Sequence, residues 1–484
     1  MTSLGSRAAR GGAITLAFQA AKVLLMLVST IVLARLLNPE DFGLVAMVTA
    51  LIGVAEIFRD FGLSMAALQA KELSQRQQSN LFWINSLVGL VLTILGMALA
   101  GPISSFYGDP RLEPIVLACS SVFLLGGLTT QFRVRINRDL RFFTLSWIDF
   151  APYVIAFAVA VLFASRGAGY WALVAQQVAL AVSALVLAVA LARWWPSLPH
   201  RGESMRPLLN FGFSFATTQL LSYATRNLDS VAIGRVWGAD ALGFYNRAYQ
   251  LVTAPLSQIN TPLSRVAVPV LARITDDKPR YLRFLRQAQL IATYVTSSLL
   301  LLLAGIGTPL VVMTMGSAWS AAGPILSILA IGGVFRSISQ ISYWIFMSNG
   351  LAAQQLRFFL VAQPTVLVVM LLGLPWGGIG VAIGNAVGYA LYWVASLAWA
   401  GRCAEVSVGV LFRDSSRIIG VVGLPILAVS LLSTALLPMD WLRVAAALGA
   451  ALVWLLVAYA LFPFVRRDLH TLIRIGRRAT GRAS

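Results

Sequence analysis

Long apolar runs fill the chain from end to end, separated by short gaps that hold the charged and turn-forming residues. A helix needs about 20 apolar residues to cross the hydrocarbon core of a bilayer. Cutting the sequence at the gaps gives fourteen runs of this length. The pattern predicts an all-α polytopic membrane protein with about 14 transmembrane helices, near residues 11–36, 41–68, 80–105, 114–134, 143–165, 168–193, 208–235, 239–272, 284–307, 320–348, 354–375, 377–401, 413–436 and 440–463.

Composition excludes a water-soluble globule. Of the 484 residues, 58% are hydrophobic and 11% are charged, against about 45–50% and about 25% in soluble domains. The net charge of +19 would suggest nucleic acid in a soluble protein. Here the basic residues gather in alternate loops: if the N-terminus is cytoplasmic, 26 fall in inside segments and five in outside segments. Cytoplasmic loops carry such an excess, so we expect both termini in the cytoplasm.

Two stretches match without a gap at an offset of 200 residues. Residues 31–43 align with residues 231–243, which pairs Arg35 with Arg235 and Gly43 with Gly243. Six spans separate the copies, so both run in the same direction, and the halves are expected to be related by a pseudo-twofold axis along the membrane normal. The predicted parts are an N-terminal six-helix lobe (1–200), a C-terminal six-helix lobe (201–405), two additional transmembrane helices (406–463) and a basic amphipathic cytoplasmic tail (464–484).

The sequence lacks the motifs that enzymes use for catalysis. His200 and His470 are the only histidines, and both lie outside the spans, so a Ser/His/Asp arrangement within the membrane is excluded. No H-E-x-x-H, paired C-x-x-C or G-x-x-x-x-G-K-[ST] motif occurs. We therefore expect no enzymatic activity, no metal site and no cofactor.

Ionisable side chains inside the spans are informative because each costs at least about 2.5–3.5 kcal/mol to insert. Glu56 with Arg59, and Arg226 with Asp229, have the i, i+3 spacing that allows pairing on one helix face. Unpaired cations would instead indicate a water-filled cavity for an anion, and guanidinium groups favour phosphate. The predicted substrate-binding residues of a central cavity are Lys22, Arg59, Arg226, Arg247 and Arg336, and the candidate sites of cation coupling are Glu56, Asp60 and Asp229.

Three prolines lie in the predicted span 239–272. Pro255, Pro262 and Pro269 each remove a backbone donor, which should kink or break the helix. This makes the span a candidate gate or hinge. The alternative is a static kink that serves packing.

Several motifs resemble the polysaccharide transporter family, the Wzx-type O-antigen and exopolysaccharide flippases of the multidrug/oligosaccharidyl-lipid/polysaccharide exporter superfamily. They are Leu-Asn-Pro-Glu-Asp-Phe-Gly (37–43), Phe-Gly-Leu-Ser-Met-Ala-Ala-Leu (61–68), Tyr-Asn-Arg-Ala-Tyr-Gln-Leu (245–251) and Val-Pro-Val-Leu-Ala-Arg (268–273). The resemblance implies two six-helix lobes around a central cavity. It also implies alternating access that moves a polyprenyl-diphosphate-linked oligosaccharide from the cytoplasmic to the outer leaflet of a bacterial inner membrane.

The partners that the resemblance implies are the lipid-linked oligosaccharide, membrane lipids, and polysaccharide polymerase and chain-length machinery, with no nucleic acid. One alternative is a multidrug efflux antiporter of the same superfamily, which would need unpaired acids for organic cations, whereas the excess inside the spans is basic. A membrane glycan polymerase or ligase is a third hypothesis, disfavoured because the loops are short.

Overall fold

The computed structural model describes residues 2–60, 63–69, 73–200 and 205–470, with side chains for all of these except residues 2–13, 57, 60, 66, 69 and 206–226. Within these ranges every regular element is a helix. The chain forms two compact units, Met1–Gly243 (unit 1) and Phe244–Ser484 (unit 2). The predicted all-α fold is confirmed.

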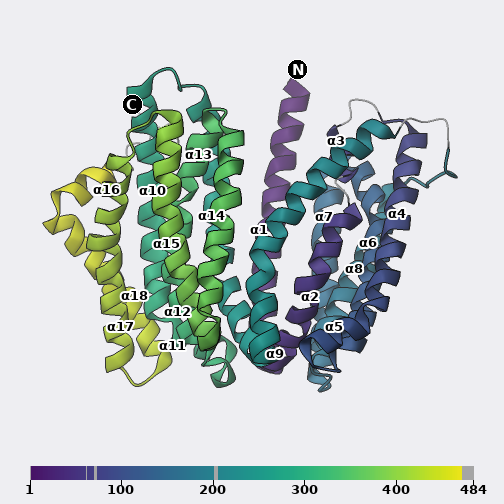
Figure 1. The fold of residues 1–484 in the computed structure, drawn as a ribbon, viewed down its shortest axis with the longest axis horizontal. Helices are drawn as coiled ribbons and strands as arrows, with labels where there is room; N and C mark the ends of the chain where they lie inside the picture. Colours follow the sequence, from purple (N-terminus) through teal and green to yellow (C-terminus); the bar gives the residue numbers. More distant parts are fainter. Residues whose placement is uncertain (1, 61–62, 70–72, 201–204, 471–484) are drawn as a thin grey trace. The chain divides into compact units, whose positions relative to one another are not determined.

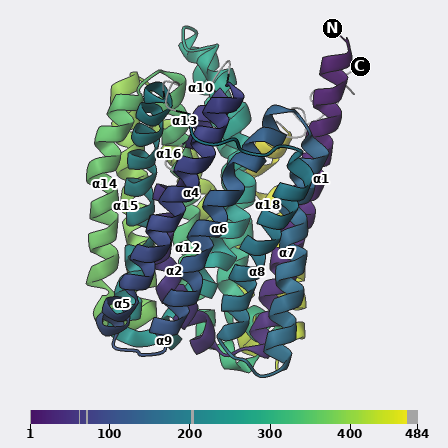
Figure 2. The same ribbon diagram turned by 90° about the vertical axis from the view of Figure 1, so that its right-hand side faces the viewer.

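Unit 1 is a bundle of helices that run nearly parallel to one another (Figures 1 and 2). A capping box starts the fourth helix: the Ser74 hydroxyl accepts from the backbone N–H of Gln77, and the Gln77 side chain accepts from the backbone N–H of Ser74. The helices of unit 1 before α9 are α1 (Thr2–Leu36), α2 (Pro39–Asp60), α3 (Leu63–Gln69), α4 (Gln75–Ala98), α5 (Ala100–Tyr107), α6 (Leu112–Arg138), α7 (Phe142–Ser165) and α8 (Trp171–Ala192).

One long helix, α9 (Arg206–Ala272), carries the chain from unit 1 into unit 2. Its backbone leaves helical geometry at Gly238, where φ is 80° and ψ is −173°, a conformation that is open almost only to glycine. This break matches the predicted gap between spans 208–235 and 239–272. Pro255, Pro262 and Pro269 lie in the helical part of α9 and do not break it, and their role as a gate or hinge stays a prediction.

Unit 2 contains the remaining helices, which Figure 1 shows in green to yellow. The Asp277 side chain caps the first of them by accepting from the backbone N–H of Arg280 at 3.0 Å. The helices are α10 (Lys278–Gly305), α11 (Gly307–Met315), α12 (Ala322–Ile338), α13 (Gln340–Ser348), α14 (Ala352–Leu372), α15 (Gly377–Ala404), α16 (Gly409–Ile418), α17 (Leu424–Leu436) and α18 (Asp440–Leu461), with short turns of helix η1 (Ser317–Trp319), η2 (Leu374–Trp376) and η3 (Ile419–Gly423).

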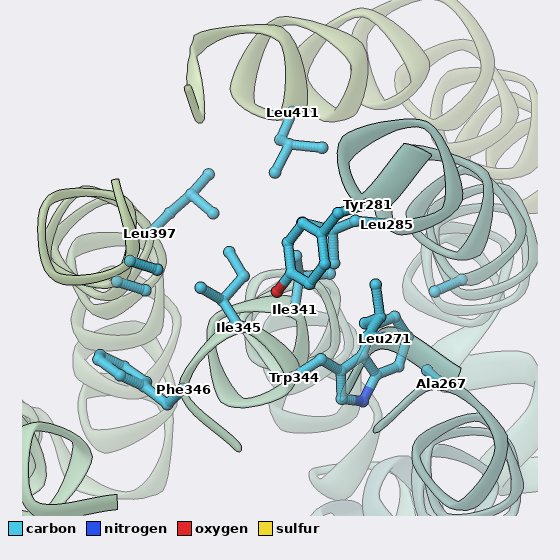
Figure 3. Packing of buried hydrophobic residues seen from close by; sticks show 13 residues of the cluster. Ala267, Leu271, Tyr281, Leu285, Ile341, Trp344, Ile345, Phe346, Leu397 and Leu411 are labelled. Atoms are coloured by element: carbon cyan, nitrogen blue, oxygen red, sulfur yellow. The ribbon is translucent and has the colours of Figure 1, made fainter. Parts of the chain in front are cut away.

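A buried apolar cluster joins five helices of unit 2 (Figure 3). Tyr281 on α10 and Trp344 on α13 lie at its centre, and Leu271 on α9, Leu397 on α15 and Leu411 on α16 pack around them. The Tyr281 hydroxyl shares a hydrogen bond of 2.8 Å with Ser348. The cluster therefore holds the end of α9 and the start of α16 against the same helices.

The helices after α15 are attached to α10 by buried charges. Asp414 on α16 is fully buried and forms an ion pair with Arg286 on α10. Arg417 lies 2.8 Å from Asp468 in the segment after α18, and the Tyr294 hydroxyl donates to Asp468 at 3.1 Å. Of the predicted tail, residues 471–484 lie outside the described part of the chain.

Eleven helices in the described part of the chain are long and apolar enough to cross a membrane. They correspond to eleven of the predicted spans. The spans near 41–68, 208–235 and 239–272 coincide with α2, α3 and α9, which are helical but are not among the eleven. The polytopic membrane architecture is confirmed, and the count of 14 stays a prediction.

The two copies of the sequence repeat touch each other inside unit 1. A Cβ atom built on Gly43 would lie 1.7 Å from the carbonyl oxygen of Ala239, and one built on Gly243 would lie 2.1 Å from the carbonyl oxygen of Pro39. Positions 39 and 239, like 43 and 243, are counterparts at the offset of 200. The contacts are therefore reciprocal, as a twofold relation between the copies requires.

Candidate anion-binding cavity

A cavity of about 390 Å³ lies within unit 1, lined by α1, α2, α6, α7 and α8. Each of these helices contributes polar side chains to the wall. Five residues with charged side chains line the cavity: Lys22, Glu56, Arg59, Arg133 and Asp149. Three of them are basic and two are acidic, so the charge of the lining residues favours an anion.

Arg59, in the last turn of α2, has a guanidinium group that fits against a glycine of a neighbouring helix. A Cβ atom on Gly126 of α6 would lie 1.4 Å from Nη1 of Arg59, so the missing side chain at Gly126 provides the space for the guanidinium group. The Nε atom of Arg59 is buried and has no hydrogen-bond partner in the described part of the chain. A buried guanidinium N–H without an acceptor is costly, and an anion in the cavity would satisfy it.

A chain of buried amides holds the backbone near Arg59 in place. The Asn85 side chain on α4 donates to the carbonyl oxygen of Arg59 at 3.4 Å. Gln131 on α6 donates in turn to the Asn85 side chain at 3.3 Å. The amides join α2, α4 and α6, as buried polar residues in membrane bundles commonly do.

Lys22 enters the cavity from α1. Its Nζ atom lies 4.1 Å from the ring centroid of Tyr153 on α7, a cation–π contact that orients the ammonium group without neutralising it. Within the described ranges, no carboxylate forms an ion pair with Lys22. Lys22 therefore contributes positive charge to the cavity together with Arg59.

Arg133 on α6 and Asp149 on α7 form an ion pair on the cavity wall. The sequence places Arg133 at the cytoplasmic end of its span, where it counts toward orientation, and it is absent from the predicted site residues. Arg133 lies beside Asp149 because α6 and α7 pack against each other. The signal in the sequence is Asp149, an acid inside a span that needs a basic neighbour.

The alternative of local pairing between Glu56 and Arg59 is not observed. Both side chains line the cavity, but the described residues include no ion pair between them. Glu56 is exposed on the cavity side. The side chain of Asp60, the neighbouring candidate for cation coupling, lies outside the described residues.

The other predicted residues belong to α9 and to unit 2. Asp229 is buried and its carboxylate accepts from the backbone N–H of Ser230 at 2.8 Å. The side chain of Arg226 lies outside the described residues, so the pair that its spacing to Asp229 allows stays a prediction.

Arg336 and Arg247 lie in unit 2. Nη1 of Arg336 donates to the Tyr249 hydroxyl at 2.7 Å, and its guanidinium carbon lies 5.3 Å from the ring centroid of Tyr389. Nη1 of Arg247 donates to the Gln250 side chain at 2.6 Å. The structure thus brings Lys22 and Arg59 together in one cavity, whereas these two arginines are held by polar and aromatic neighbours within unit 2.

Two solved structures share the fold of this chain. The chain matches the structure of "Lipid II flippase MurJ, inward closed conformation" with a TM-score of 0.73 and 14% identity, over 92% of this chain and 98% of that one. It also matches an inward-facing multidrug resistance MATE family transporter of the MOP superfamily, with a TM-score of 0.60 and 14% identity over 79% of this chain and 94% of that one. At these identities, the matches show the shared fold.

A family profile described as "Polysaccharide biosynthesis protein" matches residues 32–324, which is more than half of the chain. The chain belongs to this family. The resemblance seen in its motifs is thereby confirmed, and the protein is a multi-pass membrane protein.

Individual relatives agree with the family assignment. The chain is 31% identical over 301 residues to the teichuronic acid biosynthesis protein TuaB of Bacillus subtilis (strain 168), and the aligned region covers 62% of each protein. It is 26% identical over 318 residues to the lipopolysaccharide biosynthesis protein WzxC of Escherichia coli (strain K12), which is 64% of each protein. The aligned part thus spans slightly less than two thirds of the length of these two relatives.

Proposed function

We propose that the protein is a flippase that moves a polyprenyl-diphosphate-linked oligosaccharide from the cytoplasmic to the outer leaflet, in the biosynthesis of a cell-surface polysaccharide. The family and the names of its relatives support the transported class. The observation that carries the proposal is the cavity of unit 1, where the buried Arg59 Nε lacks an acceptor and Lys22 lacks a carboxylate partner among the described residues.

The cavity suits the diphosphate group of such a substrate. Arg59 offers a planar guanidinium group that binds phosphate oxygens through two parallel N–H donors. Lys22 adds a point charge, and Arg133 adds a second guanidinium when the substrate competes with Asp149. A volume of about 390 Å³ is at the small end of ligand sites, so the diphosphate occupies the cavity and most of the oligosaccharide lies outside it.

The same charges disfavour a multidrug exporter. An organic cation would have to enter a cavity whose wall holds three basic and two acidic residues, one of the acids already paired with Arg133. Glu56 is the acid without an ion-pair partner within the described ranges. We assign it the role of proton or cation coupling, since ionisable groups at membrane depth commonly serve this purpose.

We further propose that the protein acts in the bacterial inner membrane as a transporter and not as an enzyme, with both termini in the cytoplasm. The bias of 26 basic residues inside against five outside supports this orientation. Alternating access would move the two lobes, with α9 and its prolines as the hinge. Polymerase and chain-length proteins are the partners expected from the same biosynthetic step.

Translocation in liposomes tests the function. The purified protein is reconstituted with a fluorescent polyprenyl-diphosphate oligosaccharide, and the label that reaches the opposite leaflet is measured by quenching. Arg59→Gln and Lys22→Gln should each lower translocation about 10- to 100-fold, the loss expected for one charge-assisted hydrogen bond of about 1.5–3 kcal/mol.

Arg166→Gln is the matched control, because Arg166 lies in the loop after α7 and outside the cavity lining. It should leave translocation unchanged. Normal translocation by both cavity variants would contradict the assignment of the site. Absence of translocation by the unmodified protein with several glycans, together with drug efflux from cells, would reject the function.

A further inference from the structure

Unit 2 contains a groove that the proposed diphosphate site does not use. It has a volume of about 220 Å³ and lies between α14 and α15. Its walls are apolar except for Thr365, Tyr392 and Trp399, and the Thr365 hydroxyl already donates to the carbonyl oxygen of Val361. A ligand that needs several hydrogen bonds, such as a sugar, therefore finds few partners in this groove.

The groove is long and narrow. Its lining residues recur at helical spacing from Phe358 to Val369 on α14 and from Gly388 to Trp399 on α15, which corresponds to about 16 Å along each helix. Gly388 lets α14 and α15 approach closely at the floor of the groove, because a Cβ atom there would lie 3.1 Å from the Val366 side chain. This shape fits an extended apolar chain.

The groove is open along its length. Val361 is 64% exposed and Leu391 is 55% exposed, although both line it. Both helices are long and apolar enough to cross a membrane, so hydrocarbon chains and not water surround this surface. An apolar chain therefore fits the groove, and the polar groups at its end decide which lipid is preferred.

One end of the groove is aromatic. The Phe358 ring centroid lies 5.3 Å from that of Tyr392 and 5.6 Å from that of Trp399. Because α14 and α15 are joined by the short turn η2 and pack together, they run antiparallel, so the start of α14 and the end of α15 lie at this same end.

Two exposed arginines flank the aromatic end. Arg357 precedes Phe358 on α14, and Arg402 follows Trp399 by three residues on α15, which places it near the same helix face. In the described ranges, neither has an ion-pair or hydrogen-bond partner. The groove thus combines an apolar channel with positive charge at one end, the complement of a lipid that carries a phosphate on a long hydrocarbon chain.

The groove and the unit 1 cavity use helices of the same order in the two predicted lobes, but at different positions along them. Helices α7 and α8 are the fifth and sixth spans of the predicted N-terminal lobe, and α14 and α15 are the fifth and sixth of the C-terminal lobe. The first pair lines a charged cavity and the second an apolar groove. The lining residues are not counterparts, because at the offset of 200 residues 358–369 and 388–399 correspond to 158–169 and 188–199, whereas the cavity uses 148–153 and 177–184 of α7 and α8.

We propose that the groove between α14 and α15 is a docking site for the polyprenyl chain of the lipid-linked substrate, with Arg357 and Arg402 at the phosphate end. This inference rests on the proposed function and adds a loading site to it. The substrate is held here before its diphosphate reaches Lys22 and Arg59. The aromatic rings of Phe358, Tyr392 and Trp399 cover the part of the chain nearest the phosphate.

Photolabelling tests the site without requiring transport. The full-length protein is placed in nanodiscs of phosphatidylcholine with a benzophenone-bearing polyprenyl phosphate, and labelled peptides are identified by mass spectrometry. We expect saturable labelling of α14 and α15 that excess unlabelled polyprenyl phosphate removes. Arg357→Gln and Arg402→Gln should each raise the half-saturating concentration about 10-fold, as for the loss of one charge-assisted contact.

A tryptophan that fills the groove provides the sharpest comparison. Thr365 is exposed and lines the groove, so Thr365→Trp occupies the channel without burying new volume in the core, and labelling should be lost. Val368 is exposed on the same helix but does not line the groove. The Val368→Trp variant should therefore be photolabelled to the same extent as the unmodified protein. Equal labelling of these two variants would overturn the proposal.

Two further results would also overturn it: no saturable labelling of these helices, or equal competition by phosphatidylglycerol, which would indicate a site for any anionic lipid. The translocation assay separates this failure from that of the proposed function. If Arg59→Gln abolishes translocation while the groove is not labelled, the function stands and the docking site is wrong. If the groove is labelled but the unmodified protein does not translocate, the function fails.

Discussion

The reciprocal contact between the two copies of the repeat predicts a large cost for adding a single methyl group. In Gly43→Ala the new Cβ atom would lie 1.7 Å from the carbonyl oxygen of Ala239, and in Gly243→Ala it would lie 2.1 Å from that of Pro39. Both obstacles are backbone atoms, so no side-chain rotation relieves them. The helix segments must move apart to make room for either methyl group.

Overpacking of this kind costs about 1–3 kcal/mol in a well-packed interior. Because the obstacle is backbone in both cases, we expect each variant at the upper end of that range. Gly101→Ala is the control, since Gly101 lies in α5 of the same unit and a methyl group there would have no neighbouring atom within 4 Å. It should be neutral or stabilise the helix by about 0.5–1 kcal/mol.

The double variant tests whether the two contacts act as one. A displacement that relieves the contact at Gly43 also relieves the contact at Gly243, because the same two segments cross at both points. The cost of Gly43→Ala with Gly243→Ala should therefore fall short of the sum of the single costs by about 1 kcal/mol or more.

Unfolding by sodium dodecyl sulfate in mixed micelles, followed by tryptophan fluorescence, measures these differences. Single variants as stable as Gly101→Ala would show that the segments do not cross at the glycines. Costs that add within about 0.5 kcal/mol would show that the contacts are independent. Either result would refute the reciprocal packing.

Two further predictions concern the cavity and the loop between α5 and α6. Gly126→Ala should lower glycan translocation about 10-fold, because the new methyl group displaces the Arg59 guanidinium. The free energy of unfolding should change little, since the guanidinium is the end of a flexible side chain. Unchanged translocation would contradict the role of Gly126. The hydrogen bond from Arg111 holds the pKa of Asp109, in the loop between α5 and α6, below its usual range. The contact between Arg111 and the ionised Asp109 therefore stabilises the fold above the unfolded-state pKa of about 3.9. This stabilisation is lost as the pH falls through the lower folded-state pKa. Relative to Asp109→Asn, the unmodified protein should be more stable at about pH 6 and lose that advantage below about pH 4, as thermal unfolding against pH would show. An equal pH dependence would count against the contact.

Several features of the fold could be predicted from local pattern alone. The helical spans follow from the length of the apolar runs, and Asp277 and Ser74 start their helices with the side-chain caps that their residue types favour. The break at Gly238 falls in a predicted gap. The prolines at 255, 262 and 269 do not break α9, although their chemistry predicts a kink or a break. Packing around a helix can satisfy what a proline removes.

The site was only partly predictable for a related reason. Lys22 and Arg59 stand out in the sequence because they are charged within apolar spans, and the structure places both on one cavity. Arg133 does not stand out, because it lies at the end of its span. The i, i+3 spacing of Glu56 and Arg59 allowed a pair that the described residues do not form, since Gly126 on another helix leaves space for the guanidinium group.

Hydrophobic length, charge bias and an ungapped match are properties of the chain read in order, so they suffice to predict the class of protein, the helical spans, the orientation and the repeat. Helix packing sets which charged residues share a cavity, which basic residue pairs with Asp149, and where an apolar groove lies beside exposed arginines. Those relations join helices that are distant in the chain. They depend on how the helix faces pack, which the order of residues along one helix does not specify.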